Sequence, residues 1–417
     1  MFETLKLDEF KNFERAKLPL SPFTLLVGAN ASGKSNIREA FRFLNGVARG
    51  YSLAEIVGEK WIDGGFRVWN GVRGGAPHLI RSGSHRMSLQ TTFTAPAVDS
   101  HRPLSFDYRL DVALRDDLTL RVVREHLKES QRYIFDTHPE GDPRGGAGPT
   151  IKARIKKYGG GHPPDDTFLE DRPILGQFQS SDVATDAVKR IARAANDYLA
   201  SMVFLDLSPH AAREASQAGI SSLGDRGENL SSVLREICGE SGRREQLTSW
   251  VRALTPTDAV DFKFAIDANG RVMAELIEAQ GAAIPLTAAS DGTVRFLAMI
   301  AALMNPARPH LLFFEELENG IHPNRIFLLL DLISQSVTNT SSQIVATSHS
   351  PQLLVHAYRT RNARPCLVYR SSSGGARVVD VKSHPALRSV LSEDDPAALM
   401  AAGWFEDVAA FLDEEGL

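Results

Sequence analysis

The sequence predicts an α/β protein in which helices cover a mixed, largely parallel sheet. Short apolar runs such as Leu311–Phe314 and Ile344–Ala346 have the length and composition of buried strands. Helical patterns alternate with these runs, as parallel strands require. A glycine-rich loop also joins the apolar run Thr24–Val27 to a helical pattern at Asn36–Asn45. Together these observations favour a central sheet with helices packed on it.

Composition narrows the class of protein. The 417 residues suffice for one large or two ordinary domains, and 43% of them are hydrophobic, which allows a large core. Two cysteines, Cys238 and Cys366, cannot form a disulfide framework, so we expect a reducing, cytoplasmic location. No apolar run is long enough to cross a bilayer. The net charge of -4 argues against a surface that binds nucleic acid all over, but a local basic patch stays open.

The remaining elements follow in chain order. Leu5, Leu7 and Phe10 indicate an opening strand, and alternating patterns at Met87–Ala95 and Leu104–Val123 indicate antiparallel strands. The stretch His138–Gly161 is rich in glycine and proline, which is typical of a loop or hairpin. Amphipathic patterns predict three helices, at Ala184–Leu199, Glu228–Cys238 and Arg243–Leu254.

The loop from Gly28 to Ser35 reads G-A-N-A-S-G-K-S and fits the phosphate-binding pattern G-x-x-x-x-G-K-[ST]. Its glycines let backbone N–H groups approach phosphate oxygens, and the following helix start adds positive potential. Lys34 is expected to hold the β- and γ-phosphates, and Ser35 to bind Mg²⁺. A chance glycine-rich turn is the alternative, but the strand and helix on either side favour the phosphate site. The expected nucleotide contacts are Gly28, Asn30, Ser32, Gly33, Lys34, Ser35 and Asn36.

The apolar run Leu311–Phe314 leads directly into Glu315 and Glu316. A strand that ends in two carboxylates delivers both to the sheet edge where ligands bind in such folds. We expect Glu315 to orient Mg²⁺ through its water shell, and Glu316 to be the general base that polarises the attacking water. Without the upstream loop, such a pair is usually a solvated turn.

Two further motifs carry chemistry. Ser290, Asp291 and Gly292 precede a helix, where they could be an N-cap or N–H donors for a phosphate. His349 follows a strand inside T-S-H-S-P, where a γ-phosphate sensor is expected, although a lone histidine there is more often structural.

With these pieces in this order, the chain resembles the SMC/RecF/OLD-like branch of ABC-type AAA ATPases, especially the compact OLD-like members. The opening L-D-E-F-K-N-F from Leu7 is similar to that group's first strand, and G-A-N-A-S-G-K-S-N to its Walker A motif. S-D-G-T-V-R-F-L from Ser290 resembles its signature, and E-E-L-E-N-G-I-H-P from Glu315 its Walker B motif and D-loop. T-S-H-S-P is similar to its histidine switch.

The resemblance implies a two-lobed ABC-type P-loop ATPase head that uses ATP and Mg²⁺. Residues 1–95 and 308–417 are expected to form lobe I. Residues 96–307 are expected to hold the remaining strands and a helical lobe II with the signature. In this family two heads form a homodimer, in which the signature residues Ser290 and Gly292 act in trans on the partner's nucleotide. Asp291 of the same motif is also expected to bind nucleotide. Lys11 is expected to reach the α-phosphate in cis, and Asn319 and His322 to lie at the dimer seam. Whether dimers assemble further stays open.

The sequence departs from the family pattern at three points. Glu315 stands where Asp is usual, which lengthens the metal-facing arm and favours slow turnover. Gln90, Gln177 and Gln179 are alternative Q-loop residues. No long heptad stretch separates the P-loop from the signature, so coiled-coil arms are not expected.

The residues after His349 bear on a nuclease activity. They are too few for the nuclease domain of OLD-like nucleases, so we do not expect that domain here. We interpret Glu393–Asp395 as a helix start rather than a metal site.

These features predict an ATP-hydrolysing dimeric switch of a prokaryotic DNA-related or anti-phage defence complex, acting through a separate nuclease-like or toxin-like effector. The alternative is a RecF-like DNA repair clamp. A strand across Lys152, Arg154 and Lys156 could grip a nucleic-acid backbone, or it could be a solvated hairpin edge. The opening strand and the D-G-T signature disfavour a transporter motor.

Overall fold

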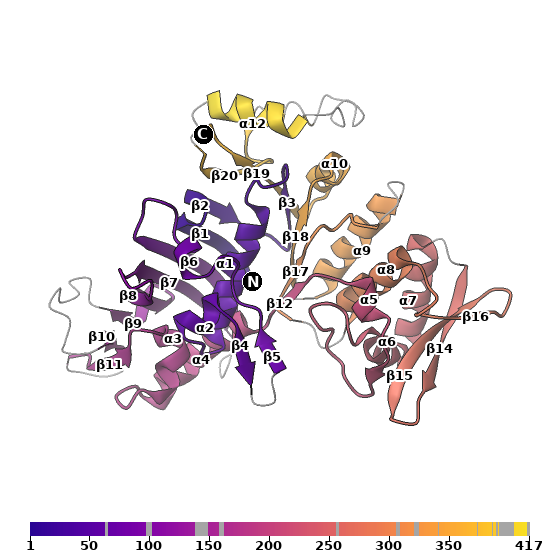
Figure 1. Cartoon of the computed structure of the whole chain (residues 1–417), viewed down its shortest axis with the longest axis horizontal. Helices are drawn as coiled ribbons and strands as arrows, with labels where there is room; N and C mark the ends of the chain where they lie inside the picture. Colours follow the sequence, from indigo (N-terminus) through magenta and orange to yellow (C-terminus); the bar gives the residue numbers. More distant parts are fainter. Residues whose placement is uncertain are drawn as a thin grey trace.

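The structure is a computed structural model that describes residues 1–62, 66–96, 102–137, 149–157, 162–255, 258–305, 309–320, 325–340, 342–372, 374–385, 387–388, 391 and 404–414. Figure 1 shows a large sheet on one side, a mainly helical region on the other, and a second sheet between them. The predicted α/β class is therefore confirmed.

The large sheet has eight antiparallel strands in the order β11-β10-β9-β8-β7-β6-β1-β2. They are β1 (Phe2–Phe10), β2 (Phe13–Pro19), β6 (Arg86–Ala95), β7 (Leu104–Leu114), β8 (Leu120–Glu129), β9 (Arg132–Thr137), β10 (Thr150–Ile155) and β11 (Asp165–Leu169). Leu7 pairs with Leu89 of β6, and both side chains are buried, so one face of the sheet is a core face. The predicted antiparallel strands are confirmed, and β10 lies inside the sheet rather than at its edge.

The second sheet has six strands in the order β12-β17-β18-β3-β19-β20. They are β3 (Phe23–Val27), β12 (Met202–Leu205), β17 (Leu311–Phe314), β18 (Gln343–Ser348), β19 (Ala363–Arg370) and β20 (Ala376–Asp380). Every neighbouring pair is parallel except β19 with β20. Side chains of β17 alternate between two cores, since Phe313 packs into one and Phe314 into the other. A strand buried on both faces needs the continuous apolar run that the sequence shows.

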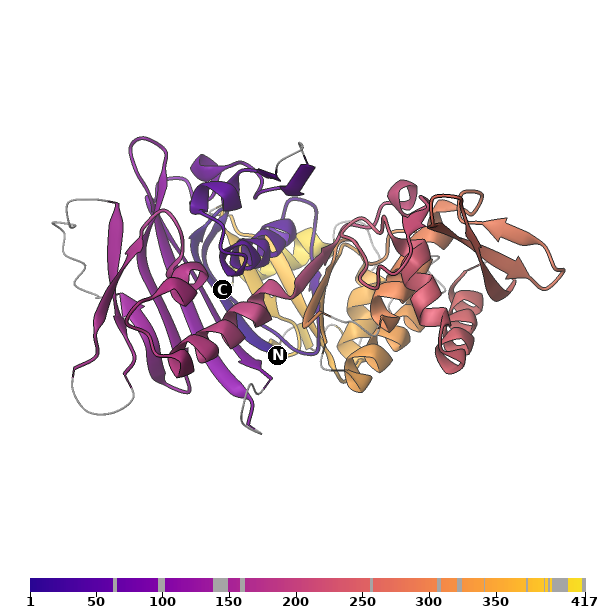
Figure 2. The same cartoon turned by 90° about the horizontal axis from the view of Figure 1, so that it is seen from below.

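Helix α1 (Lys34–Ala48) lies between the two sheets. The ring of Phe41 lies 5.8 Å from that of Phe2 in the large sheet and 6.1 Å from that of Phe313 in the parallel sheet. Figure 2 shows α4 (Asp186–Ala200) lying along the large sheet, and its Val188 and Ala192 join the same core. Smaller elements complete this side: α2 (Leu53–Val57), β4 (Lys60–Ile62), β5 (Phe66–Trp69), the 3-10 turns Ala76–His78 and Phe178–Ser180, and α3 (Ile174–Gln177).

The opposite face of the parallel sheet is covered by helices α8 (Asp291–Met304), α9 (Ile326–Asn339) and α10 (Pro351–Arg359). Helices α6 (Leu230–Cys238) and α7 (Ser241–Leu254) pack against α8 on the side away from that sheet. A short helix, α5 (Pro209–Ala212), packs beside α8, and α12 (Trp404–Glu414) packs near β19. The three amphipathic helices predicted from the sequence are confirmed as α4, α6 and α7. The longest described helices, α1 and α4, have 15 residues each, so the described chain carries no coiled-coil arm.

A small antiparallel sheet in this second region was not anticipated. It consists of β13 (Ser216–Gln217), β14 (Ala259–Ile266), β15 (Arg271–Glu278) and β16 (Ala283–Pro285). Its signal was present, because Asn269 and Gly270 form a hairpin turn between two alternating runs. Three further expectations, on His322, on Glu393–Asp395 and on most of the glycine-rich stretch, fall outside the described residues. None of the described helices has the length and apolar character needed to span a membrane.

Candidate nucleotide-binding site

The loop between β3 and α1 is shaped by its glycines. A Cβ on Gly28 would lie 2.0 Å from the carbonyl oxygen of Val368, so no side chain fits there. Gly33 has φ +120, and a Cβ on it would lie 3.0 Å from Asn12 Nδ2. No side chain caps the first turn of α1, whose positive end therefore remains available to an anion. The loop thus meets the steric demands of a phosphate cradle.

This loop forms one wall of a polar pocket of about 530 Å³. The pocket brings together the loop, the acidic end of β17, the end of β18 and one arginine from after β5. Its lining residues are Asn30, Ala31, Ser32, Gly33, Lys34, Ser35, Asn36, Arg73, Glu315, Glu316, Thr347, Ser348 and His349. Residues nearly 320 positions apart meet here because β3 lies beside β18, and β18 lies beside β17.

Lys34 lies across the loop. Its ammonium donates hydrogen bonds to the carbonyl oxygens of Gly28 at 2.6 Å and Ala29 at 2.8 Å. Burial lowers the pKa of Lys34, while the carboxylates of Glu318 and Glu316 act in the opposite direction. The positive charge of Lys34 is therefore held inside the cradle.

Glu315 and Glu316 have different surroundings. The carboxylate of Glu315 lies 3.6 Å from Arg38 Nη1 on α1. Glu316 has φ +47, a left-handed backbone that is unusual for a residue with a side chain. Its N–H donates to Thr347 Oγ1 at 3.0 Å, and its carboxylate accepts a hydrogen bond of 3.0 Å from Asn319. Strain at such a position is typical of functional sites.

His349 is oriented by Glu318, a residue that the sequence analysis missed. One oxygen of Glu318 accepts the His349 backbone N–H at 2.7 Å and lies 3.2 Å from the ring Nδ1. The histidine side chain is 52% exposed, whereas Glu318 is 11% exposed, so the carboxylate is the fixed partner. The acidic run of residues 315–318 was the signal that could have suggested this role.

Lys11 does not line the pocket in this structure. Its ammonium donates to the carbonyl oxygen of Arg73 at 2.7 Å and forms an ion pair with Glu39. Arg73 lines the pocket instead, with a side chain that is 71% exposed and an Nε that donates to Glu39 at 2.7 Å. No motif pointed to Arg73, because its position depends on a contact between distant segments. The contact of Lys11 with an α-phosphate stays a prediction.

The signature residues lie outside this pocket. Ser290 caps α8 by accepting the N–H of Thr293 at 3.2 Å, and Asp291 forms an ion pair of 2.6 Å with Arg213. A Cβ on Gly292 would lie 3.2 Å from the carbonyl oxygen of Gly320. The side chains of α8 pack in the core on the far side of the parallel sheet from α1. Within one chain, the signature residues and the P-loop therefore do not share a pocket.

The three alternative Q-loop residues also lie elsewhere. Gln90 bonds Asp107 in the large sheet at 2.7 Å, Gln177 bonds Leu169 at 2.9 Å, and Gln179 bonds the backbone of Lys189 at 3.0 Å. None of the three lines the polar pocket.

The pocket residues fit ATP and Mg²⁺. Mg²⁺ in nucleotide sites takes one or two carboxylates together with phosphates and water. The hydroxyl of Ser35 and the carboxylate of Glu315 line the same pocket and supply oxygen ligands of that kind. Among the described residues there is no group of three or more His, Cys, Asp or Glu that could hold a metal ion. A Mg²⁺ ion here would therefore depend on phosphate and water as further ligands.

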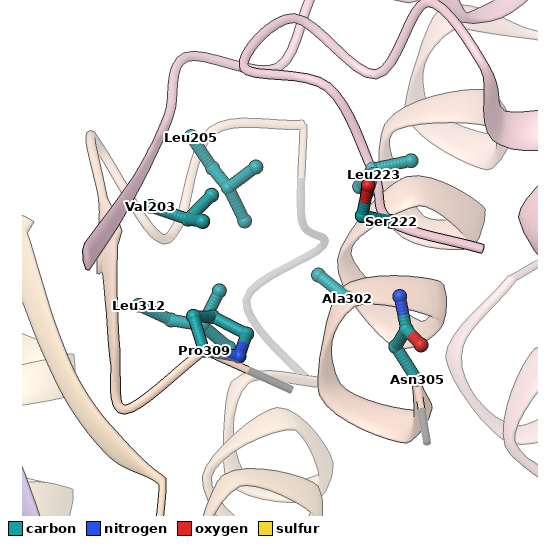
Figure 3. Close-up of a pocket in the computed structure, with 8 residues that line it drawn as sticks. All are labelled: Val203, Leu205, Ser222, Leu223, Ala302, Asn305, Pro309 and Leu312. Carbon is teal, nitrogen blue, oxygen red and sulfur yellow. The ribbon is translucent and has the colours of Figure 1, made fainter. Parts of the chain in front are cut away.

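Two other pockets lack this chemistry. Figure 3 shows an apolar pocket of about 200 Å³ between β12, β17 and the end of α8, where Val203, Leu205 and Leu312 face Leu223 and Ala302. A pocket of about 230 Å³ lies between the P-loop and α12, under Phe405 and Ala409. Neither combines a lysine with carboxylates, so the polar pocket is the candidate nucleotide site.

The chain is an AAA-domain protein with a fold like that of SMC-type ABC ATPase heads. The family model described as "AAA domain, putative AbiEii toxin, Type IV TA system" matches residues 23–355, and the chain belongs to this family. No curated protein matches the sequence significantly.

A solved structure of an Smc head shares the fold. The structure titled "Crystal structure of the SmcHead bound to the C-winged helix domain of ScpA" is similar at a TM-score of 0.53 and 15% identity, covering 93% of this chain and 99% of that one. An Smc head domain from Pyrococcus furiosus, bound to the C-terminal domain of ScpA, is similar at a TM-score of 0.48 and 13% identity, covering 94% and 98%.

Proposed function

We propose that this chain is an ATP-hydrolysing dimeric switch of a prokaryotic DNA-related or anti-phage defence complex, acting through a separate effector protein. The observation that carries the proposal is the division of motifs within one chain. The P-loop, the acidic strand end and His349 line one pocket, while Ser290, Asp291 and Gly292 lie apart from it. A second copy in a head-to-tail arrangement would bring its signature to this pocket.

Five side chains of the pocket have a role in this mechanism, namely Lys34, Ser35, Glu315, Glu316 and His349. Backbone N–H groups of the cradle and Lys34 hold the phosphates, Glu316 accepts a proton from the attacking water, and His349 contacts the γ-phosphate. Mg²⁺, held by Ser35 and Glu315, would offset the negative charge of the phosphates. Because Glu318 fixes His349 and Asn319 contacts Glu316, the groups around the γ-phosphate are preorganised.

A partner is favoured by the family and by one similar structure. The family description names a toxin–antitoxin system, which involves two components. The similar SmcHead structure is bound to the C-winged helix domain of ScpA. We infer that the ATP-bound dimer presents a surface to a nuclease-like or toxin-like effector.

Light scattering tests the switch. Wild type and Glu316→Gln would be compared with and without ATP and Mg²⁺, alongside phosphate release. We expect ATP to double the mass, and Glu316→Gln to stay dimeric while its phosphate release falls roughly 100- to 1000-fold. A mass that does not respond to ATP, with hydrolysis intact, would contradict the composite site. A purified dimer that cuts nucleic acid unaided would contradict the separate effector.

A RecF-like DNA clamp is the second candidate. It is favoured by β10, where Lys152 and Arg154 are exposed on the face opposite the buried Ala153 and Ile155. Double substitution of Lys152 and Arg154 to Gln would weaken DNA binding and flatten its salt dependence if this face grips phosphates. Unchanged affinity and salt slope would reject this candidate.

A further inference from the structure

Arg295 of α8 reaches the edge of the parallel sheet where Glu316 lies. Its Nη1 donates to the carbonyl oxygen of Leu207, just after β12, at 2.9 Å. Its Nη2 donates to the carbonyl oxygens of Glu315 at 3.2 Å and Glu316 at 3.3 Å. One guanidinium thus bridges the ends of two neighbouring strands. A guanidinium can do this because its several N–H donors point in fixed directions in one plane.

These contacts matter because the backbone of Glu316 is strained. The left-handed backbone of Glu316, at φ +47, persists only where the surroundings fix it. Thr347 accepts the N–H of Glu316, and Arg295 donates to the carbonyl oxygens on either side of that N–H. The peptide groups that aim the Glu316 side chain are therefore held from two directions, by β18 and by α8.

The same part of α8 carries the signature residues. Gly292 lies three residues before Arg295, and a Cβ on it would meet the carbonyl oxygen of Gly320 at 3.2 Å. A Cβ on Gly320 would in turn lie 3.7 Å from Cδ of Arg295. The start of α8, Arg295 and the segment after Glu316 therefore pack as one unit.

We propose that Arg295 is a positioning residue that holds Glu316 of its own chain in place and ties it to the helix that carries the signature. This inference rests on the proposed function, because it assigns Glu316 as the general base. Arg295 does not itself line the pocket, and it acts through the backbone of Glu315 and Glu316, which do.

Mixed dimers with two different tags separate a role within the chain from a role across the dimer. In the reference dimer, wild type is paired with Glu316→Gln, so only one Glu316 is active. In the first test dimer, Arg295→Met is paired with Glu316→Gln, which removes Arg295 from the chain with the active Glu316. In the second, wild type is paired with the double variant Arg295→Met/Glu316→Gln, which removes Arg295 from the other chain.

We expect the first test dimer to hydrolyse ATP about 10- to 100-fold more slowly than the reference at saturating ATP, as for a misplaced catalytic group. The second test dimer is expected to stay within about twofold of the reference. Equal loss in both, loss only in the second, or no loss in the first would overturn the proposal. A Glu316→Gln homodimer with wild-type hydrolysis would instead reject the proposed function itself.

Two further variants control for folding. Arg244→Met removes a different guanidinium, which lies away from the pocket. Arg244 donates to the carboxylate of Asp261 and to the backbone carbonyl oxygen of Phe262. It is expected to leave hydrolysis unchanged, and circular dichroism melting compares its stability with that of Arg295→Met. Arg295→Lys keeps one donor group and is expected to recover part of the lost rate, whereas a purely steric role would give full recovery.

Discussion

The P-loop and the signature segment both precede a helix, but the side chains around them differ. The P-loop lies together with the other residues proposed to act on phosphate, because Lys34 lies across it and Glu316, Thr347 and His349 line the same pocket. The signature segment lies outside that pocket, where the Ser290 cap and the Arg213–Asp291 ion pair hold it. One segment lines the polar pocket, and the other lies outside it.

The contrast suggests how ATP could control association. A site whose parts are divided between two copies can close only when both are present, so nucleotide binding and dimer formation become one equilibrium. Arg295 adds a connection, because it joins the signature helix to the strand end that carries Glu316.

The largest effect is expected from Gly28→Ala, which would change the shape of the P-loop. The new Cβ would lie 2.0 Å from the carbonyl oxygen of Val368, so the loop must move. We expect nucleotide affinity to fall at least 100-fold and the free energy of unfolding to fall by about 1–3 kcal/mol. Gly242→Ala is the matched control, because a Cβ there meets nothing within 4 Å. Fluorescent nucleotide titration and thermal melting measure both effects, and unaltered affinity in Gly28→Ala would contradict the cradle.

An intermediate effect is expected from Glu318→Gln. The amide still accepts the backbone N–H of His349 but loses the charge beside the ring. We expect kcat to fall about 10-fold with little change in nucleotide affinity, since His349 is the proposed contact of the γ-phosphate. Steady-state phosphate release separates kcat from KM. A change in KM alone would show that Glu318 supports binding rather than the chemical step.

A smaller effect on the signature side is expected from Asp291→Asn. The Arg213–Asp291 pair is 77% exposed at the aspartate, so its loss should change the free energy of unfolding by less than about 1 kcal/mol. Nucleotide binding by the monomer should not change, because Asp291 lies outside the pocket. ATP-dependent dimerisation, followed by light scattering, is expected to weaken. Weaker nucleotide binding without any change in dimerisation would contradict the trans role.

The smallest effect on ATP hydrolysis is expected at Glu125, which belongs to the scaffold and to neither segment. Its buried carboxylate accepts hydrogen bonds from Tyr108 and from the N–H groups of Ile174 and Leu175, and burial raises its pKa to about 7. The folded protein therefore holds a proton that the unfolded chain releases near pH 4.5. This contribution to stability is complete below pH 4.5 and is lost as the pH rises through 7.

Glu125→Gln keeps the shape of the protonated side chain and removes the titration. Denaturant unfolding measures the free energy of unfolding between pH 4.5 and 7. As the pH rises over this range, that free energy should fall by up to about 3 kcal/mol more in wild type than in the variant. ATP hydrolysis at a fixed pH should be the same in both proteins. Parallel stability profiles would show that Glu125 ionises normally.

The sequence predicted the elements around the candidate site because its motifs are local. A strand, a glycine-rich loop and a helix follow one another at residues 23–48, and β17 ends at Glu315, so the apolar runs were sufficient to predict both. Arg73, Arg38 and Glu318 were missed, because each acts through a contact between segments far apart in the chain. The small sheet at β14–β16 was missed although Asn269–Gly270 marks its turn. Local pattern predicted the elements, while long-range packing decided which side chains meet.

The most direct test of the shared site mixes two defective copies. Glu316→Gln lacks the proposed base but keeps its signature, whereas Gly292→Glu keeps the base and places a carboxylate where the signature should meet phosphate. Each homodimer should be nearly inactive, and an equal mixture should recover about one quarter of the wild-type rate, since half the dimers are mixed and each has one complete site. No recovery, with both variants folded and binding ATP, would contradict an ATP site built from two copies, as would wild-type hydrolysis by Gly292→Glu alone.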